Sequence, residues 1–212
     1  MSKELKWSEY DFSQIPFDDI EHFGTRSMLD RDTFTVSWLL GRFCNYRCSY
    51  CWPYARSDKK DHRPLAATIG TINEIKRQAR ERGFNSFHFS LSGGEPTFHP
   101  SYLDIVRHLN DDVSNCNFHS LHMTSNVSRP IKWFEEYYQA SKDMHRVSIT
   151  ASYHREHVNT PKKVVEFADK LVFCQEHNIQ ITINIVMVPE MFEQFYEEAL
   201  YFHSRDINVT LK

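Results

Sequence analysis

A chain of 212 residues, 41% of them hydrophobic, is long enough for one domain with a substantial core, such as a partial α/β barrel. Its formal net charge of −3 gives no basis for predicting a nucleic-acid or membrane-surface partner. No apolar run approaches the roughly 20 residues that a membrane-spanning helix needs, and residues 1–4 contain no apolar signal region, so we expect a cytoplasmic protein.

The first 33 residues are acidic and aromatic and follow no helical or strand period. They are too rich in apolar surface to be typical of a disordered arm. We therefore predict an N-terminal lead-in segment at residues 1–33, with its aromatic side chains packed on a core domain formed by residues 34–212. The aromatic residues of the segment include Trp7, Tyr10, Phe12, Phe17 and Phe23.

Strand and helix patterns alternate along the rest of the chain. Predicted strands lie at residues 34–40, 86–92, 120–126, 147–152, 181–188 and 207–211. Predicted helices lie between them, at residues 67–82, 100–109, 130–140, 161–177 and 191–204. This alternation indicates right-handed crossovers and mostly parallel strands. Six strands are too few for a closed eight-fold barrel, so the predicted fold is α/β, a partial (β/α)6 barrel that is open and TIM-like.

Most of the predicted strands are apolar on one face and polar on the other. In the second strand Phe87, Phe89 and Leu91 alternate with His88 and Ser90, and the four later strands follow the same rule. Parallel strands covered on both faces are normally apolar throughout. With helices over the apolar face, the polar face is predicted to line a wet substrate chamber. The alternative is a sheet with one face open to solvent.

Three of the five cysteines, Cys44, Cys48 and Cys51, follow the first strand in a C-x3-C-x2-C pattern. An odd count with three members clustered does not indicate a disulfide framework. Three thiolates on one loop are suited to a cubane iron–sulfur cluster whose fourth iron is open. The alternative is structural zinc, for which Cys116 or a histidine would have to complete a tetrahedral site.

A second motif, Gly93-Gly94-Glu95-Pro96, ends the second strand. Active groups of α/β sheets gather at the carboxyl ends of strands, where two glycines let the backbone approach a ligand closely. Glu95 adds a negative charge suited to an ammonium group. The alternative is an ordinary strand-to-helix turn.

Together the two motifs resemble those of the radical S-adenosylmethionine (radical SAM) enzymes, over residues 34–212. The resemblance implies a [4Fe–4S] cluster on the three cysteines and S-adenosylmethionine beside it, its amine held by the glycine motif. It places Tyr50 near the adenine, and other polar residues at the strand ends near the rest of the cofactor. The implied cofactor-binding residues are Tyr50, Gly93, Gly94, Glu95, Pro96, Thr124, Asn126, Thr150, Ser152, His154 and Asn184.

The implied activity is reductive cleavage of S-adenosylmethionine to a 5′-deoxyadenosyl radical that abstracts a hydrogen atom from the substrate. It requires a one-electron donor of the flavodoxin or ferredoxin type. The substrate is unidentified, whether a small molecule, a nucleotide or a peptide. The alternative function is a non-catalytic iron–sulfur or zinc-binding interaction scaffold.

Several histidines and a basic segment admit further hypotheses. His88 and His122 face the predicted chamber and are candidate substrate contacts. His154 and His157 have a His-x-x-His spacing, but we favour a cofactor or substrate contact for His154 over a second metal. Residues 52–63 are basic and aromatic. One hypothesis is that they bind an anionic substrate group or an acidic electron donor; the alternative is a solvated charged loop. Surface positions are expected for His62, His99, His119 and His177.

Overall fold

The computed structural model describes residues 32–52 and 56–212. Of the lead-in segment predicted for residues 1–33, all but the last two residues lie outside this description. Within the described part, no helix is long and apolar enough to cross a membrane.

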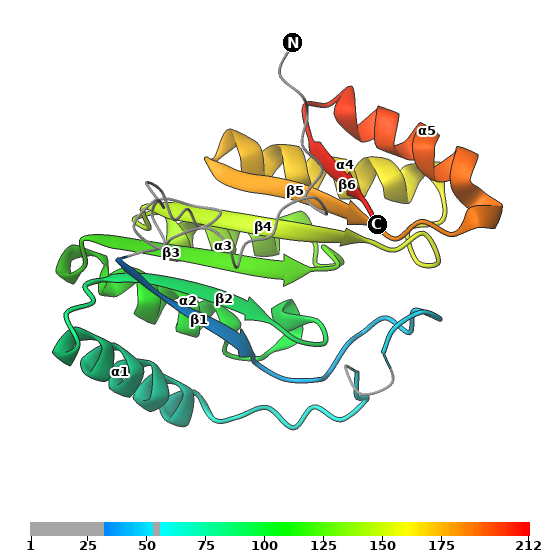
Figure 1. Cartoon of the computed structure of the whole chain (residues 1–212). Coiled ribbons are helices and arrows are strands. Elements are labelled where there is room, and N and C mark those ends of the chain that lie inside the picture. The colour runs from blue at the N-terminus through cyan, green and yellow to red at the C-terminus, as the bar shows by residue number, and fades with distance from the viewer. Residues whose placement is uncertain (1–31, 53–55) are drawn as a thin grey trace, which may run out of the picture. The chain divides into compact units, whose positions relative to one another are not determined.

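Six parallel strands form one sheet in the order in which they occur along the chain, with helices along its outer side (Figure 1). The predicted open α/β barrel is confirmed, and every predicted strand and helix is present with its ends within three residues. The strands are β1 (Thr33–Leu39), β2 (Ser86–Ser92), β3 (Phe118–Ser125), β4 (Arg146–Tyr153), β5 (Ile179–Ile185) and β6 (Asn208–Leu211). The helices are α1 (Leu65–Glu81), α2 (Tyr102–Asp111), α3 (Ile131–Ser141), α4 (Pro161–Glu176) and α5 (Phe192–His203).

Local sequence explains where these helices begin and end. Thr160 caps α4, because its hydroxyl accepts a hydrogen bond from the Lys163 N–H at 3.3 Å, and Pro161 follows at the first helical position. At its C-terminal end, α1 stops before Gly83, whose φ of 88° lies in the left-handed region that glycine adopts without strain.

The two faces of the sheet differ as their alternating pattern predicts. Phe87, Phe89 and Leu91 of β2 are fully buried against the helices. On the opposite face Ser90 lies beside His122, and Thr150 lies beside Thr182, in rows that run across the strands. These polar side chains are half-buried. Register therefore brings polar groups of separate strands together on the inner face.

Two of the histidines expected on the surface lie in the interior, so that expectation was wrong for them. His119 shares the buried face of β3, where its ring stacks on Phe89 and its Nδ1 lies 3.0 Å from the sulfur of Met144. His99 packs edge-on against His62. Burial lowers the pKa of His119 to about 3 and that of His99 to about 4, so both imidazoles are neutral at pH 7.

Candidate functional site

The three motif cysteines lie on one loop after β1, which we call the cluster loop (residues 41–52). None is in a disulfide; Cys44 and Cys48 are half-buried and Cys51 is exposed. Burial, together with the nearby charges of Glu156, Cys44 and Cys51, raises the pKa of the Cys48 thiol to about 11. A turn joins the last two cysteines, because the Cys51 N–H donates to the Cys48 carbonyl at 3.1 Å. Cys48 and Cys51 thus share one turn, and Cys44 and Cys51 both act electrostatically on the Cys48 thiol.

The glycine motif supports the start of this loop. The Glu95 N–H donates to the Phe43 carbonyl at 2.7 Å. A Cβ atom on Gly94 would lie 2.1 Å from the Phe43 oxygen, and one on Gly93 would lie 2.5 Å from the Gly41 oxygen. Both glycines also have positive φ, 45° at Gly94 and 99° at Gly93. Part of the reason for two glycines here is thus the backbone of the cluster loop itself.

Glu95 is buried, with 2% of its surface exposed, beneath the loop. Its carboxylate accepts hydrogen bonds from Thr97 N–H at 3.2 Å, from Thr97 and Ser125 hydroxyls at 2.7 Å, and from Asn126 N–H at 2.6 Å. Burial raises the pKa of Glu95, while these hydrogen bonds oppose the rise. Glu95 thereby links the end of β2 to the end of β3; its predicted contact with an ammonium group stays a prediction.

The end of β3 contacts the cluster loop through a pair of amides. The side-chain amide of Asn126 donates to Asn45 Oδ1 at 3.0 Å, and the Asn45 amide donates to the Ser128 hydroxyl at 2.9 Å. Val127, between Asn126 and Ser128, has a φ of 55°, which is rare for a β-branched residue. Lys170 of α4 donates to the Val127 carbonyl at 2.8 Å and supports this strained backbone.

The turn after β4 contacts the far half of the loop. The Tyr50 hydroxyl lies 2.7 Å from His154 Nδ1. The Ser49 N–H donates to a Glu156 oxygen at 2.9 Å, and the Ser49 hydroxyl donates to the other oxygen. The two predicted cofactor contacts, Tyr50 and His154, thus lie together.

His157 holds the same loop from the same turn. Its Nε2 accepts a hydrogen bond from the Arg47 N–H at 3.3 Å, and its ring stacks on Tyr46 at 4.0 Å between centroids. The ends of three consecutive strands, β2, β3 and β4, therefore hold the cluster loop.

The remaining predicted cofactor residues lie on the polar face, near the same ends of the strands. Thr124 of β3 lies beside Thr150 of β4, and Ser152 lies beside Asn184 of β5. All four are half-buried. The fold therefore places them in neighbouring rows, and their contact with a cofactor stays a prediction.

The two candidate substrate histidines each pair with a serine on the next strand. His88 Nδ1 lies 2.8 Å from the Ser120 hydroxyl, and His122 Nδ1 lies 2.8 Å from the Ser148 hydroxyl. The imidazole centroids are 6.5 Å apart. Burial lowers the pKa of His122, and the neighbouring His88 lowers it further, so His122 is neutral at pH 7. The inner face thus carries an ordered pair of imidazoles.

The residues on the loop suit the group that the motif implies. Three free thiols on one short loop match the three cysteine ligands of a cubane cluster with an open iron. Cys116 contacts Asp112 and Arg80 ahead of β3, at the opposite end of the strands from this loop, and Cys174 is buried in α4. Neither supplies a fourth thiolate, so zinc on this loop would need a histidine to complete its coordination.

Some residues of the site had no signal of their own in the sequence. Asn45 and Ser128 are ordinary polar residues, and Glu156 lies between the two histidines of the His-x-x-His spacing. Each lies close in the sequence to a recognised residue (Cys44, Asn126 or His154), but sequence proximity alone does not predict which contacts it makes.

The fold and the site define an α/β domain with a cysteine triad at the carboxyl ends of the strands of a partial barrel. Residues 38–201 match the Radical SAM superfamily, and the chain belongs to that family. Membership of this family implies a [4Fe–4S] cluster, bound S-adenosylmethionine, a reductant and a substrate. None of the curated proteins matches this sequence.

Solved structures that share the fold include two of SuiB. Streptococcus suis SuiB bound to precursor peptide SuiA matches with a TM-score of 0.59 and 16% identity, over 84% of this chain and 38% of that chain. SuiB bound to S-adenosylmethionine matches with a TM-score of 0.56 and 15% identity, over the same shares of the two chains. The chain thus spans about 38% of the length of SuiB, and the likeness shows the fold alone.

Proposed function

We propose that this chain holds a [4Fe–4S] cluster through Cys44, Cys48 and Cys51 and cleaves S-adenosylmethionine reductively beside it. One observation carries the proposal. The loop with these cysteines is held at the carboxyl ends of β2, β3 and β4, where ligands of parallel α/β sheets bind. When bound, the cluster and S-adenosylmethionine supply a 5′-deoxyadenosyl radical that takes a hydrogen atom from the substrate.

The protein's own contribution is to bind, orient and exclude water. In this proposal Gly94 leaves its backbone accessible for the methionyl end of S-adenosylmethionine, while Glu95 fixes the turn from within. Tyr50 and His154, 2.7 Å apart, form one wall for the adenine. The half-buried row Ser152 and Asn184 supplies hydrogen bonds to the polar parts of the cofactor.

The substrate is proposed to lie against the polar inner face of the sheet. His88 and His122 are its candidate contacts, since each imidazole is fixed at 2.8 Å by a serine and presents a defined edge. Small molecules, nucleotides and peptides all remain open as substrate classes. The electron donor is proposed to be a flavodoxin or ferredoxin type of protein, and the location the cytoplasm.

Anaerobic reconstitution with iron and sulfide tests the proposal. We expect a brown protein with absorption near roughly 400 nm, an electron paramagnetic resonance signal that changes when S-adenosylmethionine is added, and formation of 5′-deoxyadenosine after reduction. Cys48→Ala should lose both the cluster and the cleavage, whereas Cys174→Ala, a buried helix position, should keep both. A colourless protein that binds zinc on the same cysteines would contradict the proposal and favour the scaffold alternative.

A further inference from the structure

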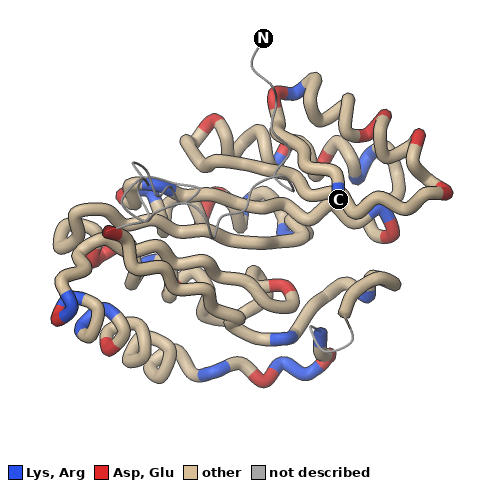
Figure 2. Tube along the Cα trace, in the orientation of Figure 1, with Lys and Arg blue, Asp and Glu red and all other residues tan. Residues whose placement is uncertain are grey.

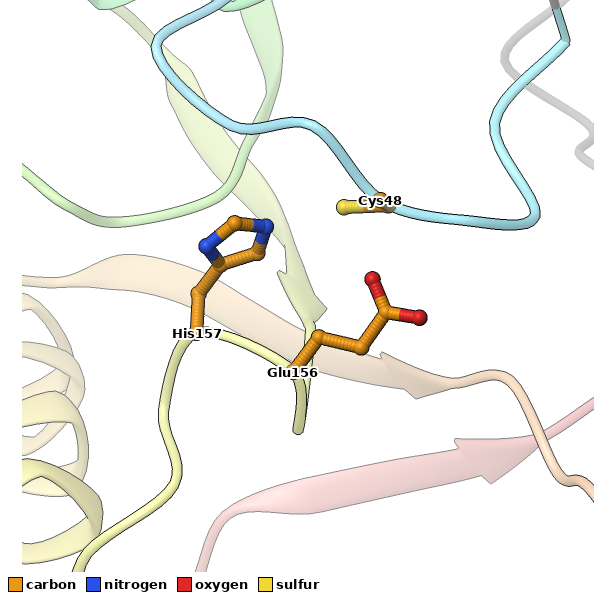
Figure 3. A group of neighbouring side chains, drawn as sticks. All are labelled: Cys48, Glu156 and His157. Atoms are coloured by element: carbon orange, nitrogen blue, oxygen red, sulfur yellow. The ribbon is translucent and has the colours of Figure 1, made fainter.

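Cys48 lies against two side chains of the β4–α4 turn, Glu156 and His157, that neither the cysteine motif nor the glycine motif includes. One ligand atom each of Cys48, Glu156 and His157 lie within 4.8 Å of one another. Figure 3 shows the three side chains pointing toward a common point, with Cys48 on the cluster loop and the other two on the turn. Such a group is either a metal site or a support for the cysteine.

The hydrogen bonds favour a support. Glu156 accepts from both the N–H and the hydroxyl of Ser49, and His157 Nε2 accepts from the Arg47 N–H. An Nε2 that accepts an N–H has no lone pair left for a metal. The two backbone N–H groups on either side of Cys48 thus both donate to side chains of the β4–α4 turn.

We propose that Glu156 and His157 are positioning residues that lower the reduction potential of the cluster held by Cys48. This inference rests on the proposed function. Hydrogen bonds to cluster sulfurs and the net charge nearby both set the potential of an iron–sulfur centre. By holding the Ser49 and Arg47 N–H groups, the turn withholds two donors from the sulfurs, and the Glu156 carboxylate adds negative charge beside Cys48. Both effects make reduction harder, so they act in the same direction.

Glu156 is fixed and ionised in this arrangement. Ser49 holds its carboxylate through two hydrogen bonds, and an exposed glutamate is ionised at neutral pH. Because the side chain is exposed, water and salt screen its charge, and its electrostatic share of the effect must weaken as ionic strength rises. The withheld N–H groups act at short range and do not depend on salt. Two variants can therefore separate the two contributions.

Redox titration of the reconstituted full chain, followed by electron paramagnetic resonance, tests the proposal. Glu156→Gln removes the charge but keeps an oxygen acceptor for Ser49, so we expect wild-type iron content and a more positive midpoint potential whose shift shrinks in high salt. Glu156→Ala also frees the Ser49 N–H, so its positive shift should be larger and persist in salt. Glu190→Gln, which neutralises a carboxylate after the next strand, is the matched control and should leave the potential unchanged.

Two results would overturn the proposal. One is a wild-type cluster whose midpoint potential stays the same in both Glu156 variants; failure of the wild type to form any cluster would instead contradict the proposed function. The other is stoichiometric Co²⁺ binding by the cluster-free chain that Glu156→Gln and His157→Gln abolish, because the two residues would then be metal ligands.

Discussion

Gly94 is the residue at which the cluster loop and the second motif come closest. Its φ is 45°, and a Cβ atom at this position would lie 2.1 Å from the Phe43 oxygen, so only a hydrogen atom fits there. The obstacle is backbone, which cannot rotate away as a side chain can. The position is therefore constrained by the fold of the loop as well as by any ligand.

Gly94→Ala is expected to destabilise the protein and to displace the cluster loop. The left-handed conformation alone costs a non-glycine residue about 1–2 kcal/mol, and the contact with Phe43 adds to it. Urea unfolding and iron content after reconstitution measure the two effects. Gly70→Ala is the matched control: nothing lies within 4 Å of a Cβ there, in the middle of α1, so it should stabilise the protein by about 0.5–1 kcal/mol. Equal stability of the two variants would contradict this explanation.

Between elements, α1 is joined to the end of α2 by a buried ion pair. Lys76 Nζ lies 2.8 Å from Asp112, and its side chain is 4% exposed beneath the rings of Phe87 and Phe89. Arg80, one turn further along α1, lies 2.9 Å from the same carboxylate. Asp112 thus has two cationic partners, whereas Lys76 relies on Asp112 to compensate its burial.

This asymmetry predicts unequal effects of the two single substitutions. Asp112→Ala leaves a buried ammonium without its carboxylate and should cost about 3–5 kcal/mol of unfolding free energy. Lys76→Met keeps an apolar chain of similar length and leaves Asp112 paired with Arg80. It should therefore lower the unfolding free energy clearly less than Asp112→Ala does. Urea unfolding at pH 7 compares them, and an equal loss in both would contradict the argument.

The Lys76–Asp112 ion pair also predicts how the loss of unfolding free energy in Asp112→Ala depends on pH. Burial by itself raises the pKa of Asp112, but hydrogen bonds from Lys76, Asn115 and Arg80 outweigh it and hold the pKa below its ordinary value. The folded-state pKa is thus below the unfolded one of about 3.9. Stability from Asp112 is present above about pH 4 and is lost as the pH falls through the folded-state pKa. The difference in unfolding free energy between wild type and Asp112→Ala should therefore become smaller as the pH falls below about 4.

On the scale of the whole molecule, charge is unevenly distributed although the net charge is only −3. Many Lys and Arg residues lie along the segment between β1 and α1 (Figure 2). This segment, residues 42–63, contains six of them and two aspartates. It carries Cys51, the exposed cysteine, and Trp52, which is 76% exposed. We therefore expect an acidic electron donor to approach the cluster loop over this basic segment.

Charge reversal at Lys59 and Lys60 is expected to slow reduction by a protein donor but not by a small one. Both side chains are exposed, and steering by such charges changes association rates by about 10–10³-fold at low salt. We expect Lys59→Glu with Lys60→Glu to slow cluster reduction by flavodoxin hydroquinone about tenfold, with dithionite reduction unchanged. Lys162→Glu on α4, also exposed, is the control. An unchanged flavodoxin rate would favour the solvated-loop interpretation.

Sequence patterns determined the architecture because they report local physics. Alternation with period two marks which side chains of a strand share a face, and Pro161 and Gly83 mark helix ends, so strands and helices were predicted to within three residues. The spacing of Cys44, Cys48 and Cys51 likewise indicated a cluster site, because ligands on one loop need no tertiary information to be close.

Only the tertiary structure decided what supports that loop. Asn45 meets Asn126, Ser49 meets Glu156, and each pair is separated by more than eighty residues, so no local pattern brings them together. Strand register decides such contacts, as it decided that His119 lies in the core. The sequence by itself thus determined the fold and the three cysteines of the loop. The structure added the ends of β2, β3 and β4 that hold those cysteines in place, because hydrogen bonds between distant residues exist only once the sheet has aligned its strands.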